Sequence, residues 1–135
     1  MCFEKMINKV MKIFNLFPLT VLQNKITLED DERNILINEI KKMRDEQIEE
    51  KKSNYAWTGD TKGYEFLFSN SLFKTLSKKI SSVVIDYLHT LEINSENLDI
   101  YYQRSWATFT DNEQSINFHT HSQSNISFAY YLLKP

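Results

Sequence analysis

The feature that most constrains the fold is a change in apolar spacing at Leu98. Before it, apolar residues recur at steps of three and four, which is typical of one face of a helix. From Leu98 onward they alternate with polar residues, which is typical of half-buried strands. Helices first and antiparallel strands second predict an α+β fold with the helices packed against one face of a sheet. At 135 residues, we expect one domain covering residues 1–135.

The first predicted helix follows residue 27. Leu36, Ile40 and Met43 form an apolar stripe at helical spacing. Thr27 is the expected N-cap and Asp30 stands three residues later, which is a variant of the capping box.

The second predicted helix is the clearest element of the sequence. Its apolar residues form a broad face of the kind that packs on a sheet, and either Asn70 or Ser71 can cap its start. The residues of this face are Phe73, Leu76, Ile80, Val83, Val84, Tyr87, Leu88 and Leu91.

Between the helices lies a predicted loop, residues 53–69, which contains both glycines of the chain, Gly59 and Gly63. They indicate tight backbone geometry. The loop also carries Tyr55 and Trp57, so it either lines a substrate cleft or forms a packed connector. Taken alone, the sequence favours the connector.

Three antiparallel strands are predicted after the second helix, over residues 98–109, 116–121 and 126–133. In the last of these, alternate side chains fall on two faces. The bulky face, which we expect to join the core, comprises Ile126, Phe128, Tyr130 and Leu132. The smaller face comprises Ser127, Ala129, Tyr131 and Leu133.

His119 and His121 are the candidate metal ligands, because residues two apart on a strand point to the same side. Two imidazoles bind a divalent cation from one side, and a mononuclear site needs a further protein ligand. An H-x-H pair also occurs on exposed strands that bind nothing. Ser127 and Tyr131 are candidate binding residues for an acid-bearing cosubstrate, because a phenol donates hydrogen bonds to a carboxylate.

Composition and charge exclude several functions. The net charge is −2, with 16 basic and 18 acidic residues well mixed, which argues against a nucleic-acid surface. The single cysteine, Cys2, excludes an internal disulfide and a cysteine-based zinc site, and we expect a cytoplasmic location. Charged residues interrupt the apolar start of the chain, so no membrane span is predicted. The sequence contains no H-E-x-x-H, G-x-S-x-G or glycine-rich phosphate motif.

Several short motifs occur in an order that resembles a known family. They are Leu16-Phe17-Pro18, Tyr55-Ala56-Trp57-Thr58-Gly59-Asp60, Ser105-Trp106-Ala107, His119-Thr120-His121 and Ser127-Phe128-Ala129-Tyr130-Tyr131. Residues 16–135 resemble the N-terminal and middle portion of the 2-oxoglutarate/Fe(II)-dependent oxygenases of bacteria and phages, with prolyl-hydroxylase-like features. Each motif is weak alone, and their shared order carries the resemblance.

The resemblance implies a double-stranded β-helix, a jelly-roll-like and cupin-like barrel, of which this chain would form a part. It implies Fe(II) bound by His119, with His121 at the place where most relatives have an Asp, and 2-oxoglutarate bound through Tyr131. The implied reaction is hydroxylation of an unknown small-molecule or protein substrate. The chain departs from the family at Ser122, where relatives have Pro, and at Phe128, where they have Gly.

The family continues beyond the position that matches Pro135, and its distal His and Arg lie in that continuation. Two hypotheses follow. The chain is an oxygenase whose remaining strands come from elsewhere, or it is an inactive, truncated homologue that acts as a binding module. In both, strand edges near residues 126–133 are expected to be exposed and to favour a homodimer or a complementing polypeptide.

Overall fold

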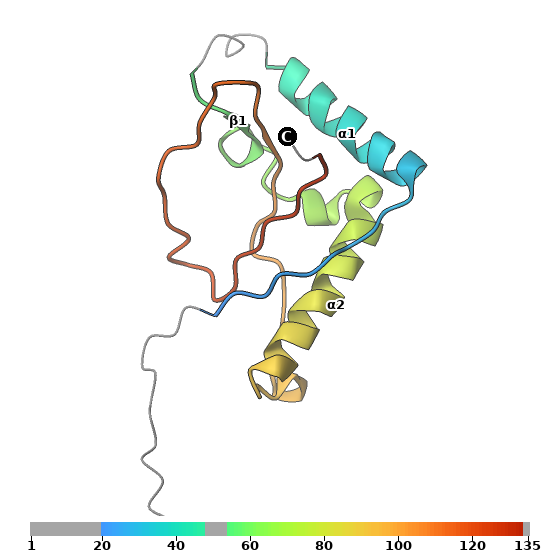
Figure 1. The fold of residues 1–135 in the computed structure, drawn as a ribbon, viewed down its shortest axis with the longest axis vertical. Coiled ribbons are helices and arrows are strands. Elements are labelled where there is room, and N and C mark those ends of the chain that lie inside the picture. The colour runs from blue at the N-terminus through green and yellow to red at the C-terminus, as the bar shows by residue number, and fades with distance from the viewer. Residues whose placement is uncertain (1–19, 48–53, 134–135) are drawn as a thin grey trace, which may run out of the picture.

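The computed structural model describes residues 20–47 and 54–133 (Figure 1). Within these ranges the chain forms α1 (Asp30–Asp45), β1 (Trp57–Thr58), α2 (Lys74–Thr90) and β2 (Thr108–Phe109), with short 3₁₀ turns between them. The fold therefore combines helices with a small antiparallel sheet, which is compatible with the α+β class predicted from the sequence. The Leu16-Phe17-Pro18 motif lies outside the described residues.

Helix α1 begins later than predicted. Its N-cap is Glu29, which makes no capping hydrogen bond with its side chain, so the predicted Thr27 cap is wrong. Acidic residues fill the first turn instead, and their charge stabilises the N-terminal end of the helix dipole. The predicted apolar stripe is confirmed, because Leu36, Ile40 and Met43 are all buried.

Helix α2 is preceded by a 3₁₀ turn, Ser71–Phe73, that Asn70 caps. The Asn70 side chain accepts a hydrogen bond from the backbone N–H of Leu72 at 3.0 Å, which confirms one of the two predicted caps. The buried face of the helix is narrower than predicted, because the sheet it was expected to cover is very small. Its buried members are Leu76, Ile80 and Leu88, and Phe73, at the N-cap position, is buried as well.

The sheet joins the loop between the helices to the segment after α2. Trp57 pairs with Phe109 and Thr58 with Thr108, in antiparallel register. An isolated bridge between Phe66 and Ser105 continues the contact between the two segments. The two segments therefore hold each other over more residues than the two-residue strands suggest.

The loop over residues 54–69 is the packed connector that the sequence favoured. Trp57 is only 7% exposed and belongs to the hydrophobic core. Gly63 has φ of +85°, a backbone conformation that residues with a Cβ rarely adopt. At Gly59 a Cβ would lie 3.2 Å from Tyr64 Cβ and 3.3 Å from the Trp57 ring, so both glycines have a structural role.

The predicted strands over residues 98–109, 116–121 and 126–133 are reduced to β2, and this part of the prediction is wrong for the described structure. A strand exists only where a neighbour receives its backbone hydrogen bonds. Residues 116–121 and 126–133 form no such ladder with any other described segment. The two-residue alternation persists only over residues 130–133, where Tyr130 and Leu132 pack on the core while Tyr131 and Leu133 are exposed. Phe128, which was also expected to join the core, is 45% exposed, so the prediction is wrong at this residue.

The core lies between the two helices and the connector. In Figure 1 both helices lie on one side, and the segment after α2, drawn in orange and red, loops out on the other. Among the described residues, no helix is both long and apolar enough to cross a membrane. The core residues are Leu28, Leu36, Ile40, Met43, Trp57, Leu67, Phe73, Leu76 and Ile80.

Residues 20–29 form an extended strap that crosses α2 (Figure 1). Three side chains donate hydrogen bonds to its backbone carbonyls. Lys79 Nζ lies 2.7 Å from the Thr27 oxygen, and the Tyr87 hydroxyl lies 2.8 Å from the Thr20 oxygen. The third donor, the hydroxyl of Tyr130, comes from the end of the described chain. The strap is thus attached by side chains rather than by a strand partner.

Candidate metal centre

The histidine pair lies on an exposed loop that runs from Ser115, whose backbone is hydrogen-bonded to the connector, to a turn that Ser124 closes. At the start of the loop, the Ser115 carbonyl accepts a hydrogen bond from the Ala56 N–H at 2.9 Å. At its end, the Ser124 N–H donates to the His121 carbonyl at 3.1 Å and closes a turn. The loop therefore holds both histidines at the surface without placing them on a strand.

The two imidazoles face each other through the same ring atom. His119 Nε2 and His121 Nε2 are 3.2 Å apart, and the ring planes are nearly perpendicular at 84°. Two ring nitrogens that each lie about 2.0–2.1 Å from one metal ion, at angles between a right angle and the tetrahedral value, are separated by roughly 2.8–3.4 Å. The observed separation therefore suits two ligands of a single cation.

His119 has a hydrogen bond that fixes the state of its ring. Its Nδ1 lies 2.8 Å from the Asn117 carbonyl oxygen, and a carbonyl only accepts, so Nδ1 carries the proton and donates it. In the neutral ring, Nε2 is then the acceptor of the hydrogen bond that His121 Nε2 donates, and its lone pair is directed at His121. Metal-binding histidines commonly donate their second ring N–H to a backbone carbonyl in this way, which orients the ring for its metal.

His121 is held by a different kind of contact. Its ring lies 5.5 Å from the ring of Trp106, centroid to centroid, at a tilt of 39°. Trp106 also contacts Arg104, whose guanidinium lies 5.5 Å from the Trp106 ring centroid and donates a hydrogen bond to the Asp60 carbonyl at 2.9 Å. Arg104 was missed from the sequence, although its spacing of two residues from Trp106 is a signal that could have found it.

The two imidazoles can supply two of the ligands of one transition-metal ion. Imidazole is a suitable ligand for iron, zinc, copper and nickel. No cluster of three or more His, Cys, Asp or Glu side chains that could hold a metal occurs within residues 20–47 and 54–133. The described residues therefore supply two ligands, His119 and His121, and a mononuclear iron site needs another.

Ser127 and Tyr131, the predicted cosubstrate residues, are both exposed, and Tyr131 is 71% exposed. No hydrogen bond or ring contact joins either of them to His119 or His121. The structure therefore brings the two histidines together but does not bring these hydroxyl groups to them. Their role in binding a cosubstrate stays a prediction.

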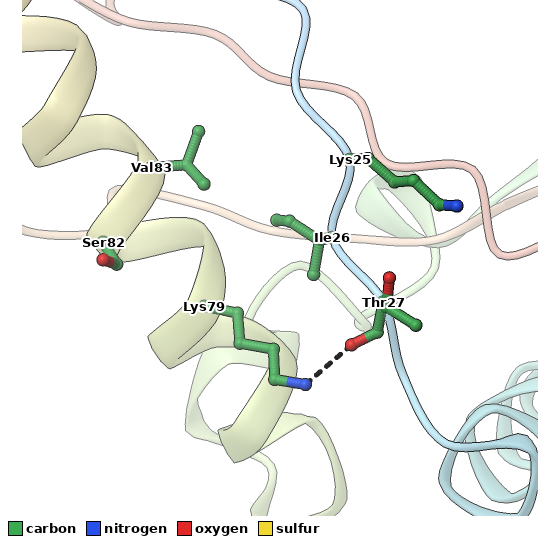
Figure 2. A pocket seen from close by; sticks show the side chains of 6 residues that line it. All are labelled: Lys25, Ile26, Thr27, Lys79, Ser82 and Val83. Carbon is green, nitrogen blue, oxygen red and sulfur yellow. Dashed lines mark hydrogen bonds between the residues drawn. The ribbon is translucent and has the colours of Figure 1, made fainter.

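A pocket of about 300 Å³ lies between the strap and α2 (Figure 2). Figure 2 shows Ile26 directed toward the helix, and Lys79 bonded to the Thr27 carbonyl at one end. None of the predicted site residues lines it. Its lining residues are Lys25, Ile26, Thr27, Lys79, Ser82 and Val83.

Comparisons of the chain with protein-family models, with curated proteins and with solved structures found no match. The function is therefore inferred from the chain's own residues. Among the described residues, His119 and His121 combine metal-binding nitrogens with a separation that fits one bound metal ion.

Proposed function

We propose that this chain is part of a 2-oxoglutarate- and Fe(II)-dependent oxygenase that hydroxylates a small-molecule or protein substrate. The observation that supports this proposal is the 3.2 Å separation of His119 Nε2 and His121 Nε2, which matches two ligands of one cation. The order of the sequence motifs is the reason for proposing iron as the metal and 2-oxoglutarate as the cosubstrate. Bound Fe(II), together with 2-oxoglutarate, would supply the oxidising chemistry.

In this proposal His119 is the better-prepared ligand, because its Nδ1–H bond to the Asn117 carbonyl already directs Nε2 toward His121, where the cation would lie. His121 is the second ligand, and as a neutral imidazole it brings no negative charge. Tyr131 and Ser127 bind the distal carboxylate of 2-oxoglutarate through their hydroxyl groups. Within residues 20–47 and 54–133 no third His, Cys, Asp or Glu joins the pair in a metal-binding group, so the proposal requires a third protein ligand from elsewhere.

The proposal also includes the barrel. Residues 116–121 and 126–133 become strands of a double-stranded β-helix when partner strands are present. The alternating burial at Tyr130, Tyr131, Leu132 and Leu133 supports this, because residues 130–133 already direct alternate side chains to opposite sides. The cytoplasmic location predicted from the lone Cys2 stays a prediction.

The test of the iron site is anaerobic titration with Fe(II) and 2-oxoglutarate, followed by the visible absorption band of the chelate. We expect a band in the wild-type protein, its loss in His119→Ala and a weaker band in His121→Ala. His89→Ala is the matched control, because His89 is an exposed helix histidine bonded to Ser95 at 3.0 Å, and it should leave the band unchanged. A wild-type protein without a band, or a band that persists in His119→Ala, contradicts the proposal.

A second candidate function is a binding module without catalysis. Large apolar side chains are exposed on the C-terminal half, most of all Phe118 at 106%, with Ile116 at 54% and Phe128 at 45%. Exposed apolar residues near unpaired segments favour association with a second copy or a complementing polypeptide. Sedimentation velocity over a wide concentration range tests this, and Phe118→Ser should weaken any self-association without changing metal binding.

A further inference from the structure

We infer that Trp106 is the positioning residue of the histidine pair: it holds the His121 ring so that Nε2 faces His119. This inference builds on the proposed metal site, but the contact that carries it is present without any metal. The contact is the one between the rings of Trp106 and His121, with centroids 5.5 Å apart.

The two histidines are held by unequal means. The His119 ring is fixed by its own hydrogen bond to the Asn117 carbonyl at 2.8 Å. The His121 ring contacts the His119 ring and the Trp106 ring. A bound cation would replace the direct contact between the two Nε2 atoms, because each lone pair would then point at the metal. The Trp106 ring is the contact that would still orient His121.

Trp106 is suited to this role because the residues on both sides of it are anchored. The Ser105 N–H donates to the Glu65 carbonyl at 2.9 Å, and the Ser105 carbonyl accepts from the Leu67 N–H at 2.9 Å. On the other side, the Ala107 carbonyl accepts from the Gly59 N–H at 2.9 Å. The backbone around Trp106 is therefore tied to the connector, and its half-buried ring offers a fixed surface to the exposed histidine loop.

Arg104 further restrains this surface. Its guanidinium group lies near the Trp106 ring and is held by its hydrogen bond to the Asp60 carbonyl. A cation over the ring face attracts the indole and limits its rotation. The order of contacts thus runs from Asp60 through Arg104 and Trp106 to His121.

Loss of the ring should weaken metal binding without removing a ligand. An aromatic contact of this kind changes an equilibrium by about 2- to 10-fold. Zn²⁺ affinity, measured by calorimetry on the full chain, should fall by about that factor in Trp106→Ala and be largely restored in Trp106→Phe. The control is Tyr101→Ala, which removes an 80% exposed aromatic side chain from the same segment and should leave the affinity unchanged.

Proton NMR of the metal-free protein separates this inference from the metal site. The ring protons of His121 should be shifted by the ring current of Trp106, and the shift should disappear in Trp106→Ala, while the ring protons of His89 stay unchanged. Ring protons of His121 that do not change in Trp106→Ala overturn the inference, even if the protein binds metal. Equal Zn²⁺ affinity in wild type and Trp106→Ala also overturns it. Wild-type protein that shows the NMR shift but binds no Zn²⁺ refutes the metal site and the positioning role with it, and leaves only the ring contact.

Discussion

The hydroxyl of Tyr130 donates a hydrogen bond to the carbonyl oxygen of Ile26 at 3.1 Å, and so joins residues 104 positions apart. Ile26 lies in the strap and Tyr130 in the last described segment. Both are half-buried and pack against the core. The bond therefore connects the two ends of the described chain across the helices.

Replacement of Tyr130 by Phe should destabilise the fold by about 1 kcal/mol, because the phenol bond is lost and the Ile26 carbonyl is left without this donor. The matched control is Tyr131→Phe. Its neighbouring phenol is 71% exposed, and the change should cost less than about 0.5 kcal/mol. Urea unfolding followed by circular dichroism measures both, and equal effects would contradict the role given to the bond.

Stability should fall at alkaline pH. The hydrogen bond to Glu46 raises the pKa of Tyr64 above 10.0, with burial and the charge of Glu46 acting in the same direction. Burial, as the largest cause, raises the pKa of Tyr130 above 10.0 as well. Below pH 10.0 both phenols are protonated in the folded and unfolded chains, so their contribution is fully present. Above it the unfolded chain loses protons first, and stability falls as the pH rises through the folded pKa.

The alkaline effect can be assigned to one residue by comparison with Tyr64→Phe. The free-energy difference between wild type and this variant should be constant below pH 10.0 and should shrink above it. Urea unfolding at a series of pH values gives this difference. A difference that grows at alkaline pH would show that the sign is wrong.

Leu36 is the most completely buried large side chain of the described core, at 1% exposure. Leu36→Ala should lower the free energy of unfolding by about 3 kcal/mol, because it removes buried apolar surface and leaves a cavity. Ile35→Ala is the matched control on the same helix, since Ile35 is 51% exposed. It should cost about 0.5 kcal/mol or less in the same denaturation experiment.

Gly63 has a left-handed backbone, and a Cβ there would meet no atom within 4 Å. Gly63→Ala should therefore destabilise the protein by about 1 kcal/mol through backbone strain alone. Gly63→Asn should cost less, because Asn tolerates this conformation better than Ala. Thermal unfolding of the two variants tests this. If Gly63→Ala and Gly63→Asn lose the same stability, backbone strain at residue 63 is not the cause.

The helices could be predicted because their signals are local. Spacings of three and four place Leu36, Ile40 and Met43 on one face whatever the rest of the chain does, and the Asn70 cap is a contact across two residues. The start of α1 was predicted two residues too early, because the helix begins at its acidic first turn without a capping side chain.

The strands could not be predicted as well, because a strand depends on a partner elsewhere in the chain. The alternating residues 126–133 direct Tyr130 and Leu132 toward the core, as expected, but form no ladder with another described segment. An alternating pattern indicates which side chains share a face, but not that the face is buried, since Ile116, Phe118 and Phe128 are all exposed. Nor does it determine whether another segment of the chain will pair with the backbone to form a ladder.

For the candidate site, the sequence by itself determined that His119 and His121 lie two residues apart and carry metal-binding nitrogens. Only the tertiary structure decided that their Nε2 atoms are 3.2 Å apart and that Trp106 holds one of the rings. The physical reason is that residue type fixes chemistry and local periodicity. The separation of two exposed rings depends on the surface against which their loop packs, and here the connector anchors that surface from far along the chain.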